Sequence, residues 1–425
     1  MRVLLMNRRN RTKEKIKMKK QLALKLVAVL MLVSILVTAC GPTATPAPTA
    51  KPTMDPGMVM ETATPTQAAA AGLPAVITLG AVHDLSGATA VYGTSIKKGI
   101  DLAIKQINEQ KYLGDGVTIK VSYEDAAGDP KQAIAAFEKL TADSNITAIL
   151  GPTLSSEAKS ADPVAQEAKV PVVASSNTAS GITDIGDYIF RTSLPESAVV
   201  PNTVKVTVDA LKLKKVAIMY GNDDAFTQSG YDVFKAALTD AKIEILDTET
   251  FAKGDTDFAT QLTKIKGLNP DAIVVSALAE EAANIMIQAR TLGIPDSVHI
   301  IGGNGFNSPK LAQIAGKAAE GAISGAAWDV SSTFPTNVDF VKAFQAEYKA
   351  DPDQFAAQAY TAAWVAAAAI KNAGSVDHAA VRDALAKIAG LDTPLGKYSF
   401  NDKRDPVHEP VVLIVKDGKF AVFQP

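Results

Sequence analysis

The chain has 425 residues, of which 47% are hydrophobic and 21% charged, a composition typical of a soluble α/β protein and not of a disordered or fibrous one. Residues 1–39 hold ten of the 43 Lys and Arg residues but one of the 45 acidic residues, so residues 40–425 carry a formal charge of −11. Residues 40–425 are acidic and contain no stripe of basic residues. This composition argues against nucleic acid as a partner.

The first 39 residues have the pattern of a secretory leader. A basic segment over residues 8–20 precedes an apolar run over 22–37, which ends in Thr38 and Ala39 followed by Cys40. Cys40 is the only cysteine, so no intramolecular disulfide is expected. The junction resembles that of a bacterial lipoprotein, which predicts a signal peptide over residues 1–39 and lipidation of Cys40. An uncleaved membrane anchor is the alternative, because the run approaches the roughly 20 residues needed to span a bilayer.

Residues 40–73 are dominated by Pro, Thr and Ala and have almost no large apolar side chains. Such a segment cannot bury enough surface to offset its ordering entropy, so we expect a flexible tether. Together with the leader, it predicts an extracytoplasmic protein held at the cell membrane by a lipid on Cys40.

From residue 74 onward, short β-branched runs alternate with longer amphipathic stretches. The first set predicts strands over residues 75–82, 117–123, 148–150 and 170–174, with helices over 92–110, 130–142 and 155–168. After a break near 194–197, a second set predicts strands over 215–220, 243–248, 272–276 and 299–302, with helices over 227–241, 257–266 and 280–292. Two such sets indicate two similar lobes, each with a parallel-type sheet between helices.

The C-terminal part of the chain adds further helices and a strand pair. The pattern predicts helices over residues 337–349, 355–373 and 377–388, and strands over 411–416 and 420–423. The Asp417-Gly418 pair between these last strands is a strong hairpin signal.

Two serine-rich loops follow neighbouring predicted strands of the first lobe. In parallel sheets, ligands bind beyond the carboxyl ends of strands, where helix N-termini present free N–H groups to anions. Residues 151–157 form one such loop, in which Ser155 and Ser156 open a helix, and residues 175–180 form the other. The two loops favour a shared carboxylate pocket. An ordinary Ser N-cap with Glu157 following in the same turn remains the alternative for the first loop.

Several spaced blocks resemble the leucine/isoleucine/valine-binding protein family, the type I periplasmic binding proteins of branched-chain amino acid importers. The likeness runs from Val76 to the C-terminus and depends on the order and spacing of the blocks. These blocks are residues 80–87 with Tyr92-Gly93, 123–125 with Asp129-Pro130, 151–156, 175–179, 288–290, 302–306, 318–321 and Ala359-Tyr360.

The resemblance implies roles for individual side chains. Ser155, Ser176 and Thr178 match the residues that hold the ligand α-carboxylate, and Tyr92 matches an aromatic residue that closes over the ligand. Phe226 matches an aromatic residue that lines the pocket from the second lobe, although plain core packing would also explain it. Asn304 and Gly305, in the block over residues 302–306, complete the implied binding set.

One position departs from the family. Asn304 stands where the family places the acid that neutralises the ligand ammonium, and Leu278 stands where well-known members place an aromatic residue. An amide does not offset the desolvation of an ammonium as a carboxylate does. Either another acid supplies the charge, with Asp125, Asp223 and Asp224 as candidates, or the ligand is not a standard zwitterionic amino acid. These acids also fit the simpler interpretation of solvated turn residues.

The implied function is that of a monomeric solute-binding protein that delivers a hydrophobic amino acid, or a related amide or carboxylate, to the permease and ATPase subunits of an ABC importer. Closure would occur about a three-segment hinge, with residues 74–194 and 326–398 in lobe 1 and residues 195–325 and 399–425 in lobe 2. Crossings are expected near residues 194–196, 323–326 and 397–401.

Two alternatives of other classes stay open: a ligand sensor acting with a membrane signalling partner, and a secreted α/β hydrolase. The four histidines, His83, His299, His378 and His408, are scattered, so neither a metal site nor a cofactor is expected. No nucleophile elbow or phosphate-binding loop occurs in the sequence, so we expect no enzymatic activity.

Overall fold

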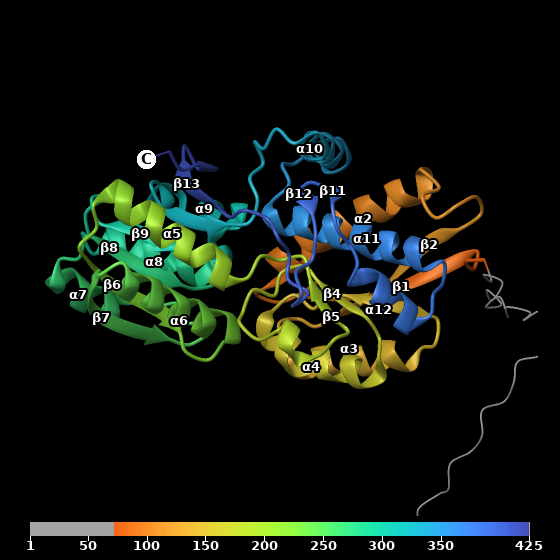
Figure 1. Cartoon of the computed structure of the whole chain (residues 1–425). Helices are drawn as coiled ribbons and strands as arrows, with labels where there is room; N and C mark the ends of the chain where they lie inside the picture. The colour runs from red at the N-terminus through yellow and green to blue at the C-terminus, as the bar shows by residue number, and fades with distance from the viewer. Residues whose placement is uncertain (1–71, 425) are drawn as a thin grey trace, which may run out of the picture. The chain divides into compact units, whose positions relative to one another are not determined.

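A computed structural model describes residues 72–424 of the chain. The predicted leader, the predicted lipidation site at Cys40 and nearly all of the predicted tether lie outside the described residues. The described part contains two large sheets, of five and seven strands, and a separate two-stranded ladder. Figure 1 shows helices packed around both large sheets.

The first sheet is parallel throughout, with strand order β2-β1-β3-β4-β5. Its strands are β1 (Val76–His83), β2 (Thr118–Asp125), β3 (Ile146–Leu150), β4 (Val172–Ala174) and β5 (Ile189–Arg191). Helices α2 (Ala90–Glu109), α11 (Gln354–Ala373) and α12 (His378–Leu385) contribute to one hydrophobic cluster, and α3 (Pro130–Ala142) and α4 (Ser155–Ala168) to another. The helices therefore cover both faces of the sheet, with α3 and α4 together on one side in Figure 1.

The second sheet has the order β14-β13-β10-β9-β8-β6-β7 and is parallel except at β13 and β14. Its strands are β6 (Lys215–Gly221), β7 (Glu244–Phe251), β8 (Ala272–Ser276), β9 (His299–Gly302), β10 (Ile323–Ala326), β13 (Val411–Lys416) and β14 (Lys419–Val422). Helices α5 (Glu196–Leu211) and α6 (Ala225–Asp240) share one hydrophobic cluster with it. Helices α7 (Ala259–Leu268), α8 (Ala279–Thr291) and α9 (Pro309–Ala315) belong to the same hydrophobic cluster as α2, α11 and α12.

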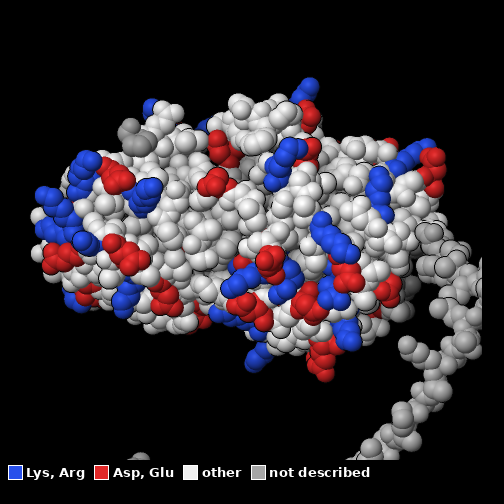
Figure 2. All heavy atoms as spheres, viewed as in Figure 1, with Lys and Arg blue, Asp and Glu red and all other residues white. Residues whose placement is uncertain are grey.

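The remaining elements are α10 (Pro335–Tyr348), the ladder of β11 (Leu391–Thr393) with β12 (Gly396–Tyr398), and three short 3₁₀ helices, η1 (Thr183–Ile185), η2 (Asn304–Phe306) and η3 (Gly316–Ala319). No helix among residues 72–424 is both long enough and apolar enough to cross a bilayer. Figure 2 shows basic and acidic side chains interspersed over the face in view.

The two predicted strand-helix sets and the two-lobed α/β class are confirmed. Helices α3 and α4 begin and end at the predicted residues, and Asp417 and Gly418 form the predicted hairpin with φ values of 53° and 71°. Helix α5 was not predicted. Its sequence is rich in Val and Thr and contains Pro201, so local propensity favours a strand, and packing of Val200 and Val204 on the second sheet overrides it.

The chain passes between the sheets three times: after β5, after β10 and after β12. Ala326 still pairs with Val411 inside the second sheet, so the second passage begins at residue 327. Residues 401–405 lie against the first sheet, because Asp405 pairs with Arg191 at 2.6 Å and Arg404 donates to the Ile189 carbonyl at 3.1 Å. We therefore propose lobes of residues 74–194 with 327–405, and 195–326 with 406–425, which moves the second and third expected boundaries.

Helix α2 approaches its neighbours closely through two glycines. A Cβ atom at Gly99 would lie 2.2 Å from the Ala356 carbonyl oxygen on α11, and one at Gly93 would lie 2.0 Å from the Asp84 carbonyl oxygen. The second contact fixes the start of α2 against the loop that follows β1. That placement fixes the backbone of Tyr92, the residue before Gly93.

We predict that Gly99→Ala lowers the free energy of unfolding by about 1–3 kcal/mol, because the added methyl group overlaps the backbone of α11. Gly267→Ala is the control, since a Cβ at this position in α7 meets nothing within 4 Å. The control should gain roughly 0.5–1 kcal/mol from the better helix propensity of Ala. Urea denaturation of both variants measures these changes, and equal effects would contradict the close-packing account.

Candidate ligand-binding site

The carboxyl ends of strands from both sheets face one cavity of about 30 Å³. It is lined by Tyr92, Thr153, Leu154, Ser155, Ser176, Thr178, Phe226, Leu278, Asn304, Gly305 and Phe355. All seven residues that the sequence assigned to ligand binding are among them. The structure thus brings the predicted set together from both lobes, and their ligand contacts remain a prediction.

The loop after β3 packs against the end of β1 and hydrogen-bonds to it. Gly151 has a φ of 123°, and a Cβ there would lie 2.3 Å from the Val82 carbonyl oxygen, so the tight exit from the strand requires glycine. The Thr153 hydroxyl accepts from the Asp84 N–H at 3.0 Å and lies 3.2 Å from Nδ1 of His83. Burial lowers the pKa of His83 to about 3, so this imidazole is neutral. These contacts fix Thr153 at the edge of the cavity.

Side chains tie the loop after β3 to the loop after β4. The Thr153 carbonyl accepts from the Ser176 hydroxyl at 2.6 Å and from Nδ2 of Asn177 at 3.0 Å. The Ser155 hydroxyl accepts from the Ala179 N–H at 3.2 Å. The two serine-rich loops therefore form one hydrogen-bonded unit, as the neighbouring positions of β3 and β4 require.

Arg191 of β5 supports this unit from the side away from the cavity. Its Nη1 donates to the carbonyls of Asn177 and Ala179 at 2.9 and 2.8 Å, while its Nε pairs with Asp405 at 2.6 Å. The guanidinium is almost fully buried, so these bonds replace its lost hydration. Arg191 thus positions the backbone of the loop after β4, a role that its isolated place in the sequence did not reveal.

The helix that follows the first loop begins differently from an ordinary Ser-capped helix. Leu154 is the N-cap residue, and the Glu157 carboxylate accepts from the Leu154 N–H at 2.9 Å. Ser155 is therefore the first helical residue, and the N–H groups of this turn have no partner within the helix. The Ser155 hydroxyl takes part in its bond to the Ala179 N–H as the acceptor, through its oxygen. Its proton is not used in that bond and can donate into the cavity. The start of α4 consequently offers donors, which suits an anion.

A pair of buried carboxyl groups lies behind this turn. Burial, and next the charge of the neighbouring Asp84, raises the pKa of Glu157 well above its usual range. Asp84 accepts from the Gly128 N–H at 2.9 Å. The nearby ammonium of Lys253, from the second lobe, acts in the opposite direction on the pKa of Glu157.

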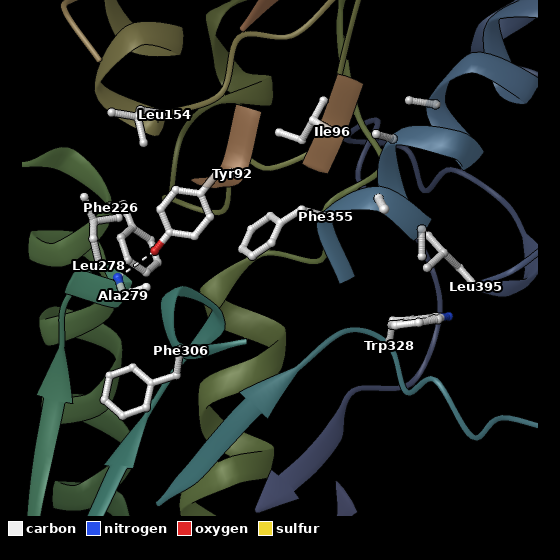
Figure 3. Packing of buried hydrophobic residues seen from close by; sticks show 14 of the residues in the cluster. Tyr92, Ile96, Leu154, Phe226, Leu278, Ala279, Phe306, Trp328, Phe355 and Leu395 are labelled. Carbon is white, nitrogen blue, oxygen red and sulfur yellow. Dashed lines mark hydrogen bonds between the residues drawn. The ribbon is translucent and has the colours of Figure 1, made fainter. Parts of the chain in front are cut away.

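Aromatic and aliphatic side chains form the opposite wall of the cavity. Figure 3 shows the Tyr92 ring among Phe226, Leu278 and Phe355. The rings of Tyr92 and Phe355 meet edge to face with centroids 4.8 Å apart. This wall can pack an apolar side chain, and Phe226 serves both it and the hydrophobic core. Phe355 was assigned to a helix but not to the site, because it comes from a distant part of the sequence.

Tyr92, Ser180 and Lys253 each make hydrogen bonds across the cleft between the lobes. The Tyr92 hydroxyl donates to the Gly305 carbonyl at 3.1 Å and accepts from the Ala279 N–H at 2.7 Å. The Ser180 N–H donates to the Ser229 hydroxyl at 2.9 Å. Nζ of Lys253 donates to the Gly128 carbonyl at 3.0 Å. The lobes therefore meet in a closed arrangement around the cavity.

Asn304 is engaged on both sides of its amide. Its Nδ2 donates to Glu196 at 2.9 Å, and its Oδ1 accepts from Gln354 at 3.1 Å. Glu196, the first residue of α5, also accepts from the Thr178 hydroxyl at 3.2 Å. The sequence did not single out Glu196 as a site residue, because the helix that it opens was not predicted.

The three acids considered from the sequence have other partners. Asp224 is the N-cap of α6 and accepts from the Phe226 and Thr227 N–H groups. Asp125 accepts from the Leu85 and Ala127 N–H groups at 2.9 Å. Asp223 accepts from the Lys253 N–H at 2.8 Å. None of these acids lines the cavity, and the turn interpretation describes their contacts.

A larger hollow of about 310 Å³ lies elsewhere, beside α9, the β13–β14 hairpin and the start of α11. Its lining includes Asn307, Trp328, Asp351 and Phe420 and shares no residue with the smaller cavity. Among the described residues, no group of three or more His, Cys, Asp or Glu side chains is placed to hold a metal ion.

Comparison with known proteins identifies the fold and the family. Residues 76–419 match the periplasmic binding protein family. The chain belongs to this family. A relative from Brucella melitensis, Leu/Ile/Val-binding protein homolog 3, is 28% identical over 350 residues, which are 81% of this chain and 93% of the relative.

Two solved structures extend the comparison of this binding protein. The branched-chain amino acid transporter substrate-binding protein LivJ of Streptococcus pneumoniae, in complex with isoleucine, is 31% identical with a TM-score of 0.77, covering 82% of this chain and 100% of that one. A solute-binding protein of R. palustris in complex with benzoate is 24% identical with a TM-score of 0.74, covering 82% and 95%. The second likeness shows the fold alone.

We predict that Tyr92→Phe favours separated lobes of the binding protein, because the Gly305 carbonyl and the Ala279 N–H lose their shared partner. The loss should weaken the closed arrangement by about 1–3 kcal/mol. Small-angle X-ray scattering should report a larger radius of gyration than for the wild type. Tyr112→Phe, a change outside the cavity, is the control and should leave the radius unchanged. A Tyr92→Phe radius equal to the control would contradict the role of this hydroxyl in closure.

Proposed function

We propose that this chain binds an α-amino acid with an apolar side chain between its lobes and delivers it to the permease subunits of an ABC importer. One observation carries the proposal. Hydrogen-bond donors of the first lobe and an apolar wall formed by both lobes line the same cavity. The Ser155 hydroxyl and the free N–H groups of the first turn of α4 suit a carboxylate. Tyr92, Phe226, Leu278 and Phe355 suit a hydrophobic side chain.

The names of the relatives support this ligand class. One carries leucine, isoleucine and valine in its name, and LivJ of Streptococcus pneumoniae was solved with isoleucine. Leu278 in place of an aromatic residue leaves an aliphatic surface on the second lobe. We therefore favour leucine, isoleucine and valine over polar amino acids as ligands.

Ligand entry requires the lobes to separate. A cavity of about 30 Å³ holds roughly one water molecule, whereas ligand pockets usually measure about 300–1,000 Å³. Opening breaks the contacts of Tyr92, Ser180 and Lys253 across the cleft, and a bound ligand would restore the connection through its own groups. Binding thereby shifts an open-closed equilibrium that a permease can distinguish.

We further propose that the protein acts outside the cytoplasm, as a monomer held to the membrane by a lipid on Cys40. The leader and Cys40 support this placement through their sequence pattern alone. A permease embedded in the same membrane would be the partner. The ligand would be released unchanged, since binding and closure need no chemical step.

A thermal-shift screen of the protein against amino acids tests the proposal. A ligand at 100 times its dissociation constant should add about 2.7 kcal/mol to the free energy of unfolding. We expect shifts with leucine, isoleucine or valine, and recovery of the unchanged ligand by chromatography after incubation.

The double variant Ser155→Ala with Thr178→Ala should lose the shift, because it removes one hydroxyl from each of the two tied loops. Ser156→Ala is the matched control, since Ser156 neighbours Ser155 in the same turn but does not line the cavity. Retained binding in the double variant would place the ligand outside this cavity.

A further inference from the structure

A chain of amide hydrogen bonds fixes which atom of Asn304 faces Glu196. Oε1 of Gln354 accepts from the Ala327 N–H at 2.6 Å and from Asn307 at 3.0 Å, so the Gln354 amino group must point away from them. That amino group donates to Oδ1 of Asn304. The Asn304 amino group is therefore directed to Glu196, because a backbone N–H, which can only donate, determines the order of the whole chain.

Glu196 is a buried carboxylate directly behind the lining of the cavity. It is 1% exposed, and its Oε1 accepts from both Asn304 and the Thr178 hydroxyl, two residues that line the cavity. The Glu196 N–H donates to the Thr178 carbonyl at 2.9 Å, which holds the two residues together through the backbone as well. Its place in the first turn of α5 favours a negative charge.

This contact decides what Thr178 offers to a ligand. The Thr178 hydroxyl donates its only proton in a hydrogen bond to Glu196. Toward a ligand, the hydroxyl oxygen can therefore only accept a hydrogen bond. Ser176 is in the same position, since its hydroxyl donates to the Thr153 carbonyl. Ser155 keeps a free proton. The cavity therefore has a donor side at Ser155 and an acceptor side at Ser176 and Thr178, and the acceptor side has a carboxylate directly behind it.

We infer that Glu196 supplies the negative charge that balances the ammonium of the bound amino acid, with Thr178 accepting the hydrogen bond between them, in place of an acid at position 304. The inference rests on the function proposed above and specifies its ligand as an α-amino acid rather than an acid without an amino group. Asn304 then acts as a neutral brace that orients the Glu196 carboxylate.

Glu196 is the charged group nearest to the Thr178 side of the cavity. The neighbouring elements present Gly230 from α6, Gly303 and Asn304 from the loop after β9, and Thr178 from the loop after β4. Among the described residues, Arg191 of β5 is the charged group that acts on its pKa, and Arg191 is itself paired with Asp405. A ligand ammonium would therefore meet a carboxylate whose charge is not already neutralised by a direct ion pair.

The same geometry makes amino acid binding depend on pH. Burial raises the pKa of Glu196 to about 7, while the bonds from Asn304 and Thr178 act in the opposite direction. The ionised form prevails above this value and is lost as the pH falls through it. Because the ammonium requires the ionised form, affinity for an amino acid should fall by about tenfold between about pH 8 and about pH 6.

The test compares amino acids with acids of the same shape that lack the amino group. Isothermal titration calorimetry of the full chain would use leucine, isoleucine and valine beside 4-methylpentanoate, 3-methylpentanoate and 3-methylbutanoate. Glu196→Gln should lower affinity for the amino acids on the order of 100-fold, because it leaves the ammonium without a charged partner. Affinity for the three acids should stay within about threefold of wild type or rise. The pH dependence of amino acid binding should disappear in Glu196→Gln.

Two further variants separate charge from folding. Glu280→Gln is the matched control, because Glu280 also lies in the first turn of a helix, beside a hollow next to Tyr92, but is exposed and does not line the cavity. It should bind like the wild type. The double variant Glu196→Gln with Asn304→Asp moves the carboxylate to position 304 and should recover most of the lost amino acid affinity. Retained binding of the three acids by Glu196→Gln shows that the single variant folds.

The outcomes distinguish this inference from the proposed function. Amino acid binding by Glu196→Gln within about threefold of wild type would overturn the inference. Equal wild-type affinity for the amino acids and the matching acids would also overturn it, and the proposed solute-binding role would stand. Failure of every amino acid and every acid to bind the wild type would overturn the proposed function itself.

Discussion

The site depends on one structural constraint, the hydrogen bonds that join the loop after β3 to the loop after β4. The Thr153 carbonyl accepts from Ser176 and Asn177, and the Ser155 hydroxyl accepts from the Ala179 N–H. These bonds consume polar groups that would otherwise face the cavity unpaired. They also decide which groups remain for a ligand: a hydroxyl proton at Ser155 and a lone pair at Thr178. The hydrogen bonds between the two loops thus determine which ligand groups the cavity can bind.

The second lobe completes this arrangement through charge and apolar surface. Phe226 and Leu278 contribute to the apolar wall, while Gly305 lies close enough to accept from the Tyr92 hydroxyl. Asn304 connects the lobes, because it bonds to Gln354 of α11 and to Glu196 where the chain first passes between the sheets. A ligand ammonium at this corner would couple its own charge to the positions of both lobes. Recognition and closure would then use the same residues.

Much of this site was predictable from sequence because its residues follow strands of a parallel sheet. The serine-rich loops at 151–157 and 175–180 follow adjacent strands, and the resemblance to a known family pointed to Tyr92, Phe226, Asn304 and Gly305, which all line the cavity. The alternative for Ser155 as an N-cap could not be decided from local sequence. Leu154 holds that position, and the Glu157 side chain bonds back to it. Only the path of the backbone distinguishes the two cases.

The parts that sequence did not reveal share a physical origin. Helix α5 has the β-branched composition of a strand, and its packing on the second sheet decides otherwise. Without α5, the sequence gives Glu196 no structural context, and Asp125, Asp223 and Asp224 are the acids that the sequence offers. Those three acids accept from backbone N–H groups at turns and a helix start, whereas Glu196 bonds to Thr178 and Asn304, two side chains that line the cavity.

A crystal structure of the protein grown with leucine tests the account most directly. The account predicts the ligand in the cavity between Tyr92 and Thr178, with its carboxylate within hydrogen-bonding distance of the Ser155 hydroxyl and its ammonium at the Thr178 side nearest to Glu196. Leucine bound with its carboxylate and ammonium reversed, or bound instead in the larger hollow beside Trp328 and Asp351, would contradict it.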